Sequence, residues 1–238
     1  AGMVTRNDSL SRYYDNNLTY NRLGSSIRYS KDGVNVTVGL AAQHFNLTGD
    51  FRRAAGATNL ATIDLNYIAW IPKVAVDLEL KNNRYLFFSY DKSVQEPSIR
   101  DLQPIVDNSN PLFLRVGNPN LLPSVNHSLS TGFNLFDAAN FMHFYSNLSY
   151  NYNVNQVVYS QSINANGIVL TKPMNISGGE SYVGYFGLGF PLKKTVSTLN
   201  VNADFNSAKN PLFLNDVLSN TNTNSGSISS RLSFTPSD

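Results

Sequence analysis

The sequence predicts an all-β fold, an antiparallel up-and-down meander of about nine strands, and two observations lead to it. The first is alternation: from Leu199 to Asn206, apolar and polar residues exchange at every position, and a strand turns successive side chains to opposite faces. The second is that Pro and Gly recur too often for long segments with helical periodicity. Each alternating segment therefore has one apolar face and one polar face.

The expected strands follow one another along the whole chain. Their approximate spans are 18–30, 34–48, 62–80, 84–91, 126–136, 141–161, 169–190, 195–206 and 225–235. The strand at 126–136 shows the pattern plainly, because Leu129, Thr131 and Phe133 alternate with small or polar residues. The segments are close to the length of a membrane-crossing strand, about 9–11 residues.

The alternation changes phase in two of these strands. In the second, apolar residues hold even positions up to Leu40 and odd positions from Phe45. In the third, they hold odd positions up to Tyr67 and even positions from Val74, with Pro72 between. A shift of one residue is typical of a β-bulge, and proline is tolerated there. We therefore expect a bulge in each strand.

Short and long connections alternate along the chain. The expected short ones are 31–33, 81–83, 137–140 and 192–194, and the expected long ones are 49–61, 92–125, 162–168 and 207–224. In a meander, all short turns then lie at one end of the sheet and all long loops at the other. Outer-membrane barrels have short periplasmic turns and long extracellular loops. This sorting favours part of a transmembrane β-barrel in the outer membrane.

Composition agrees with a strand whose polar face lines water. Charged residues make up 14% of the chain, against about 25% in ordinary soluble domains, and Asn, Ser and Thr supply the remaining polarity. A net charge of +2 without a dense Lys/Arg run excludes an electrostatic footprint for nucleic acid. The lack of cysteine excludes a disulfide framework. No apolar run of about 18 residues predicts a transmembrane helix.

No catalytic constellation is evident. His44, His127 and His143 lie in separate segments without metal-ligand spacing, and neither a nucleophile elbow nor a phosphate-binding glycine loop occurs. We therefore expect a non-enzyme without catalytic residues, metal or cofactor. The turn at 107–110 carries oxygen ligands of the kind that Ca²⁺ binds, although an ordinary Asn/Asp-rich turn is the commoner explanation.

The loop at 92–125 is the strongest candidate for function. It contains half of the prolines of the chain, which indicates a stiff, shaped loop, and loops this long are usually functional or disordered. Four polar residues in it are candidate ligand contacts: Arg100, Asp101, Arg115 and Asn118. The alternative is that they tie the loop to its neighbours, because buried loop backbone also needs partners.

The same region resembles a known family. The stretch from Tyr90 to Pro104, followed by Gly117-Asn118-Pro119-Asn120-Leu121-Leu122-Pro123, is similar to a hallmark of TonB-dependent outer-membrane receptors, in the outer-membrane β-barrel subgroup. Asn166-Gly167 and the segment Lys172-Pro173-Met174-Asn175 resemble a hairpin and strand of the same barrels. The resemblance covers roughly residues 84–238 well, and the first 80 by general character.

This resemblance implies uptake of a scarce extracellular solute such as a siderophore, a glycan or a peptide. The implied partners are outer-membrane lipid, a TonB-type energy-coupling protein acting through a plug domain, and in some systems a surface lipoprotein. Family barrels have about 22 strands, so we expect residues 1–238 to be one segment of a β-barrel domain, with the plug and the remaining strands not present. An isolated segment would be an open or folded-over sheet, since its edges are unpaired.

A soluble, secreted β-sandwich for binding or adhesion also produces alternating strands with turn signals. The two classes differ in the apolar face, which meets lipid in a barrel and packs inward in a sandwich. A barrel therefore predicts an apolar face without a second protein layer on it, and a sandwich predicts a second sheet packed on that face.

Overall fold

In the computed structural model, residues 13–52, 59–107, 109–193, 197–215 and 217–234 are described. They form one sheet and a single short helix, α1, at Ile99–Leu102. The strands are β1 (Tyr13–Lys31), β2 (Val34–Arg52), β3 (Asn59–Leu80), β4 (Arg84–Gln95), β5 (Val106–Asp107), β6 (Phe113–Val116), β7 (Ser124–Asp137), β8 (Met142–Val154), β9 (Gln156–Ile163), β10 (Val169–Ile176), β11 (Gly179–Lys193), β12 (Ser197–Leu214) and β13 (Val217–Phe234). Among these residues no helix has the length and apolarity needed to cross a membrane.

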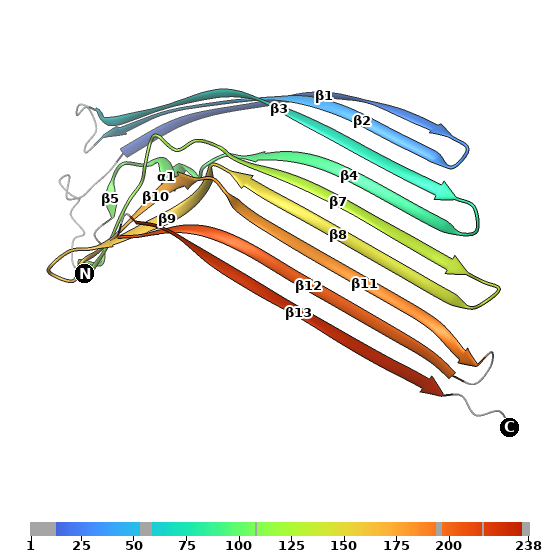
Figure 1. Cartoon of the computed structure of the whole chain (residues 1–238). Helices are drawn as coiled ribbons and strands as arrows, with labels where there is room; N and C mark the ends of the chain where they lie inside the picture. The colour runs from blue at the N-terminus through green and yellow to red at the C-terminus, as the bar shows by residue number, and fades with distance from the viewer. Residues whose placement is uncertain (1–12, 53–58, 108, 194–196, 216, 235–238) are drawn as a thin grey trace, which may run out of the picture.

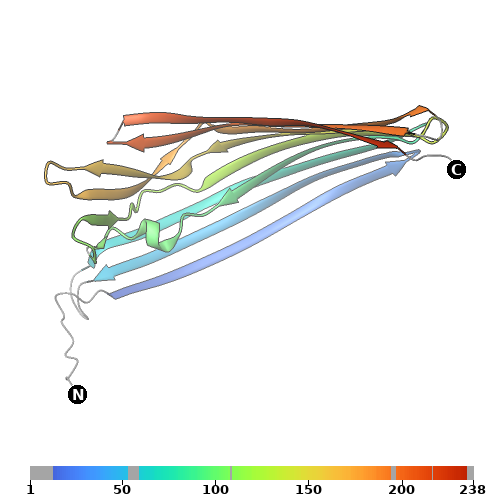
Figure 2. The same ribbon diagram turned by 90° about the horizontal axis from the view of Figure 1, so that it is seen from below.

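Nine long strands run up and down side by side, in the order β1, β2, β3, β4, β7, β8, β11, β12 and β13 (Figure 1). Each pairs with the next in the antiparallel sense, which confirms the predicted meander. Among the nine long strands, β1 and β13 lie at the two ends of this order, and in the described residues they do not pair with each other. The sheet is therefore open, and Figure 2 shows its long strands as one continuous layer.

Two predicted strands are wrong in extent, because each contains a sharp turn. The segment 141–161 divides into β8 and β9 at Asn155, which has a φ of 53°. The segment 169–190 divides into β10 and β11, with Gly178 at a φ of 98°. Alternation continues on both sides of each turn, so a period of two does not reveal it. The predicted loop 162–168 is only the tip of a β9–β10 hairpin within a longer connection.

The predicted long connection at 207–224 is also wrong. Strands β12 and β13 pair without interruption from Ser197 opposite Phe234 to Leu214 opposite Val217. The Asn-, Ser- and Thr-rich composition is typical of loops, but here main-chain pairing continues both strands through the segment. The short turns lie at one end of the sheet and the long connections near β5, β9 and β10 at the other (Figure 1).

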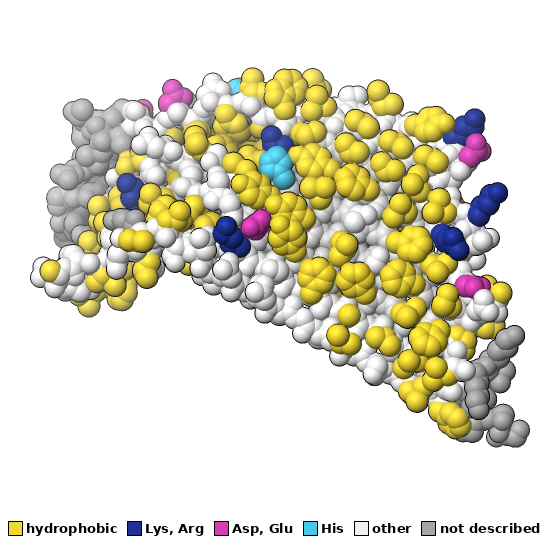
Figure 3. Space-filling model, viewed as in Figure 1, with side chains coloured by type: hydrophobic (Ala, Val, Ile, Leu, Met, Phe, Trp, Pro, Cys, Tyr) yellow, Lys and Arg dark blue, Asp and Glu magenta, His cyan; other side chains and the backbone are white. Residues whose placement is uncertain are grey.

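The register shows that one face of the sheet carries an apolar band, and we call this the outer face. Leu129 of β7 lies opposite Tyr90 and Tyr150, and Tyr150 lies opposite Tyr182. Figure 3 shows hydrophobic side chains spread over this face. In the described residues no second layer packs on it, whereas a sandwich requires one.

Two rows of paired residues span most of the outer-face band on the central strands. One row is Arg84, Leu135, Phe144, Leu188 and Val201, and the other is Lys92, His127, Tyr152, Glu180 and Lys209. They lie the same eight residues apart on every strand, or about 26 Å along the strand at about 3.3 Å per residue. This length matches the apolar band of an outer-membrane barrel, about 25 Å tall.

The phase changes in β2 and β3 are not bulges, which corrects that prediction. The β1–β2 register is uninterrupted, and β2–β3 shifts only between Phe51 and Arg52. Near the turns, the apolar residues of β2 lie on the outer face, and Val38 is 52% exposed there. Near the loops they lie on the opposite, inner face, where Phe45 and Leu47 are buried. One regular strand thus passes through two environments.

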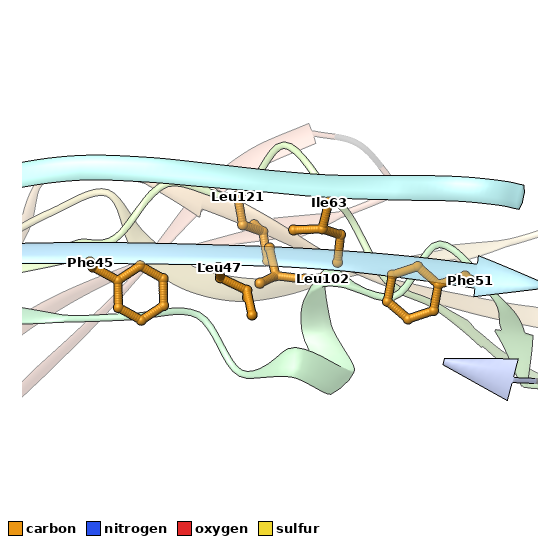
Figure 4. Packing of buried hydrophobic residues seen from close by; sticks show 6 residues of the cluster. All are labelled: Phe45, Leu47, Phe51, Ile63, Leu102 and Leu121. Atoms are coloured by element: carbon orange, nitrogen blue, oxygen red, sulfur yellow. The ribbon is translucent and has the colours of Figure 1, made fainter. Parts of the chain in front are cut away.

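The inner-face residues belong to a small hydrophobic core. Phe45, Leu47 and Phe51 of β2 and Ile63 of β3 pack with Leu102 and Leu121, which come from the long loop after β4 (Figure 4). At about 25 cal/mol per Å² of apolar surface, burial of each such side chain stabilises the contact by about 1.5–3 kcal/mol. This core fixes the loop against the inner face.

Candidate functional site

Two connections at the loop end of the sheet, 96–123 and 155–178, fold together into one unit that we call the cap. Its β6 pairs in parallel with β10, β10 pairs with β9, and β9 reaches β12 through Gln161 opposite Leu214. Segments from two separate loops therefore extend the sheet. This arrangement turns both loops into ordered structure over the inner face.

The cap begins with a one-turn helix that its own sequence specifies. Ser98 is the N-cap of α1, and its Oγ accepts a hydrogen bond from the Asp101 backbone N–H at 3.1 Å. The same hydroxyl donates to Asp101 Oδ2 at 2.7 Å. The exchange resembles a capping box, and it fixes the direction of the Asp101 carboxylate.

Asp101 is the polar centre of the cap. It is buried, and its Oδ1 accepts hydrogen bonds from Arg115 Nη2 at 2.7 Å and from the Tyr159 hydroxyl at 3.1 Å. The Arg115 guanidinium also lies 5.0 Å from the centre of the Tyr159 ring, within range of a cation–π interaction. A charged group placed this deep must be paired, so these contacts tie α1, β6 and β9 together.

A second carboxylate joins the cap to the wall. Glu96 Oε1 accepts hydrogen bonds from Gln43 Nε2 at 2.7 Å and from the Tyr67 hydroxyl at 3.0 Å. Gln43 lies on the inner face of β2 and is buried, and Tyr67 comes from β3. The loop is thus anchored at its first residues by hydrogen bonds and further along by the hydrophobic core.

The segment Gly117–Pro123 packs closely against the start of the loop. A Cβ at Gly117 would lie 2.1 Å from the carbonyl oxygen of Gln103, so only glycine fits. The Asn118 backbone N–H donates to the Asp101 carbonyl at 2.6 Å, and Asn118 Nδ2 donates to the Pro173 carbonyl at 3.1 Å. Leu121 is fully buried.

Asn175 of β10 clamps the same segment from the other loop. Its Oδ1 accepts from the Leu122 N–H at 2.7 Å, and its Nδ2 donates to the Leu122 carbonyl at 2.9 Å and to the Asn155 carbonyl at 2.6 Å. The two sequence stretches that carry the resemblance, near 117–123 and 172–175, therefore hold each other. Asn118 and Asn175 supply the side-chain hydrogen bonds of this contact.

The structure brings together three of the four predicted site residues. Asp101, Arg115 and Asn118 meet inside the cap through the contacts above, which fit the alternative that they tie the loop to its neighbours. Arg100 points elsewhere, with its Nη2 at 3.6 Å from Asp107 Oδ2. Hydrogen bonds from Ser109, and then the charge of Arg100, lower the pKa of Asp107. A role of the four in ligand contact stays a prediction.

A polar cavity of about 440 Å³ lies where the cap meets the inner face. Its lining comes from β4, α1 and its N-cap, β7, β8 and β9: Ser93, Gln95, Glu96, Pro97, Ser98, Asp101, Ser124, Val125, Asn126, Asn153, Gln156, Val157 and Tyr159. Gln156 Oε1 is buried and has no hydrogen-bond partner in the described part of the chain. A buried acceptor of this kind calls for a donor from water or a bound molecule.

Sequence reasoning missed most of this cavity. Of its lining, only Asp101 was among the predicted site residues. Glu96, Gln156 and Tyr159 come from segments that are distant in sequence, and no spacing rule relates them. The proline-rich loop was the one available signal, because it indicated a shaped segment.

Comparisons with known proteins agree with this architecture. The sequence profile described as "Outer membrane protein beta-barrel family" matches residues 3–238. A solved structure described as "Copper transporter OprC" superposes with a TM-score of 0.54 at 12% identity, over 81% of this chain and 29% of that chain. The siderophore receptor PirA from Pseudomonas aeruginosa gives a TM-score of 0.47 at 12% identity, over 94% of this chain and 52% of that chain. No curated protein matches.

The chain thus spans about a third to a half of the length of these two solved proteins. At this identity, the likeness to the copper transporter concerns the fold alone. It agrees with an open run of outer-membrane barrel wall.

Proposed function

Because the chain belongs to the outer membrane protein β-barrel family, we propose that it forms wall and cap of an outer-membrane transporter of the TonB-dependent type. The solute would be a scarce extracellular compound, and the wall would meet outer-membrane lipid. Energy would arrive from a TonB-type protein through a plug domain inside the barrel. A surface lipoprotein that delivers the solute would be a further partner.

The observation that carries the proposal is the polar cavity beneath the cap. It opens on the inner face, which becomes the lumen when such a sheet closes into a barrel. The cap that roofs it is built from the long connections, which are extracellular in these barrels. A solute entering from outside would therefore meet the cap and this cavity first.

The lining favours a neutral, hydrogen-bonding solute. Hydroxyl and amide side chains predominate, and both carboxylates already accept protein hydrogen bonds. The lining contains no lysine or arginine, and Arg115, which contacts the lining residue Asp101, is already paired with it. A glycan or a peptide thus fits the cavity better than an anionic iron chelate. The similar solved proteins are described as a copper transporter and a siderophore receptor, so chelated metal belongs in any test.

Two of the predicted loop residues retain a place in this proposal. Asp101 lines the cavity, and the side chain of Arg100 is 66% exposed. The Asp101 carboxylate would orient polar groups of a solute inside the cavity. Arg100 would contact the solute from the solvent side of the cap. Arg115 and Asn118 would support them by holding the loop.

Binding to the protein purified from outer membranes in detergent tests this function. Isothermal titration is carried out with an oligosaccharide, an oligopeptide and a ferric siderophore. We expect one of the first two to bind, and Gln156→Met to weaken that binding by about tenfold, or about 1.4 kcal/mol, because it removes the unpaired acceptor at nearly constant volume.

Ser146→Ala is the matched control, since Ser146 lies opposite Phe133 on the outer face. Its affinity for the solute should equal that of the unmodified protein. If the unmodified protein, Gln156→Met and Ser146→Ala all bind the solute with equal affinity, the solute binds elsewhere. Binding of the ferric siderophore alone would contradict the ligand class.

A further inference from the structure

We propose that the outer face carries a site for an anionic phospholipid-like molecule, with an acyl chain in an apolar hollow and the charged headgroup beside Lys92 and His127. The site lies on the face away from the polar cavity. It rests on the outer-membrane location of the chain and not on the identity of the solute.

The hollow has a volume of about 270 Å³ and is almost wholly apolar. Its rim consists of outer-face side chains of β4, β7, β8, β11 and β12: Phe88, Leu129, Leu148, Tyr150, Tyr182 and Phe205. Its floor includes Ser130, Ser149 and Val183, whose side chains alternate to the inner face, so their backbone is what the hollow meets.

A glycine accounts for the depression in the outer face at this place. Gly184 lies opposite Leu148 and Phe205 on the outer face, and a Cβ on it would come 2.1 Å from Phe205 Cε1. The Phe205 ring therefore lies across the backbone of β11 instead of standing outward. The result is a depression in a face that meets hydrocarbon chains.

The headgroup position lies one step further toward the loops. His127, Tyr152 and Glu180 follow Leu129, Tyr150 and Tyr182 on the same face, about 7 Å along the strands. Lys92 is opposite His127, and Lys209 is opposite Glu180. The Tyr90 hydroxyl is hydrogen-bonded to His127 Nδ1 at 2.8 Å. The other ring nitrogen of His127 is therefore available to the headgroup.

The charge of the headgroup position and the apolar lining of the hollow indicate which class of molecule would bind. Lys92 lies beside this position and forms no ion pair in the described residues. Glu180, the one carboxylate of the row, lies three strands away from Lys92 and opposite Lys209. The row borders the apolar band on the side of the long loops, which corresponds to the outer leaflet. Tyr150 and Tyr182 stand at the boundary, where amphipathic rings favour the headgroup level. An anionic lipid satisfies both parts of the site, whereas free phosphate satisfies only one.

Native mass spectrometry of the protein purified from outer membranes in detergent tests the site. It is titrated with phosphatidylglycerol, with phosphatidylcholine of the same acyl chains and with inorganic phosphate. We expect phosphatidylglycerol to bind at least tenfold more tightly than phosphatidylcholine, and phosphate alone not to compete with it. The substitution Lys92→Gln should abolish this preference, whereas Lys209→Gln, four strands away and opposite Glu180, should leave it unchanged.

Two further variants separate the parts of the site. Thr131 also lines the hollow, opposite Phe88 and Leu148 on the outer face. Thr131→Leu places a larger side chain there and should weaken the binding of both lipids. Arg84→Gln removes a basic residue from the opposite border of the band, eight residues from Lys92, and should change neither affinity. Equal binding of the two lipids, competition by phosphate, or an equal effect of Arg84→Gln would overturn the proposal. Solute binding is measured in the same variants. If it stays unchanged while the expected lipid preference is not found, the lipid site is overturned and the proposed transport function is not.

Discussion

Single residues of the cap act mainly by pairing with buried backbone and with one another. Asn175 binds two backbone groups of Leu122, Gly117 lets two stretches of chain touch, and Asp101 joins three elements. Backbone buried in a loop must be hydrogen-bonded, and short amide or carboxylate side chains can do this without a strand partner. The residues that identify the loop motif are therefore the ones that make it rigid.

Asp101→Asn should loosen the cap while leaving the wall intact. The amide keeps the shape of the carboxylate but loses the charge that pairs with Arg115, and hydrogen bonds to charged groups contribute about 1.5–3 kcal/mol. Hydrogen exchange of 96–123 should become faster, and that of β7 and β8 should not change. Arg100→Gln is the control, because its ion pair with Asp107 is exposed, and equal exchange in both variants would contradict the role of Asp101.

Asn175→Asp tests the clamp between the two loops. The carboxylate still accepts from Leu122 N–H, but it cannot donate to the carbonyls of Leu122 and Asn155. Two lost hydrogen bonds at about 1 kcal/mol each, with an added repulsion between oxygens, should destabilise the cap by about 2 kcal/mol. Limited proteolysis should then cut within 96–123 and 155–178. Asn166→Asp at the hairpin tip should leave the proteolysis pattern as it was.

At the level of elements, a single strand serves two surroundings. Strand β2 keeps an unbroken register with β1, yet its apolar residues move from the outer face to the inner face along its length. The outer-face part meets lipid, and the inner-face part meets α1 and the loop. The interior of a membrane barrel is usually polar, so an apolar inner face marks the place where a loop packs.

Leu47→Ala should therefore cost more than Leu40→Ala. Leu47 is 2% exposed and packs in the hydrophobic core, where truncation leaves a cavity and costs about 2–5 kcal/mol. Leu40 is 50% exposed on the outer face, where lipid chains fill the space. Thermal unfolding in detergent micelles, followed by circular dichroism, should show a lower midpoint for Leu47→Ala alone.

At the level of the whole molecule, the sheet separates a lipid-facing surface from a water-facing one. The outer face bears the apolar band, and the inner face bears Asn, Ser and Asp residues together with the cavity. The chain is an open part of an outer-membrane barrel wall, so its edges call for further strands, because lipid cannot satisfy unpaired backbone groups.

Adjacent residues on opposite faces should respond differently to the same charge. Leu148 lies in the middle of the outer-face band, and Asn147 points inward on the same strand. Leu148→Lys should cost about 2–4 kcal/mol, as for lipid-facing lysine near the bilayer midplane, whereas Asn147→Lys should cost little. Denaturant unfolding in phospholipid vesicles measures both, and equal costs would contradict the assignment of the faces.

Strand existence and the two faces could be predicted from the sequence, and the site could be predicted only in part. The nine long strands were expected, but the turns at Asn155 and Gly178 were hidden within continuing alternation. The Asn-, Ser- and Thr-rich composition of 207–224 predicts a loop, whereas the structure pairs this segment as the loop-side ends of β12 and β13. Arg115 and Asp101 were both singled out, but Glu96, Gln156 and Tyr159 were not, since no local rule brings them together.

The sequence by itself determined the period of two, the sorting of polar and apolar faces and the polar, shaped loop after Tyr90. These follow from backbone geometry, which acts over neighbouring residues. Only the tertiary structure decided that two loops join as a cap, that the phase change in β2 marks packing and not a bulge, and that a polar cavity lies beneath. Such features depend on contacts between segments far apart in the chain, and a local pattern carries no information on which distant segments meet.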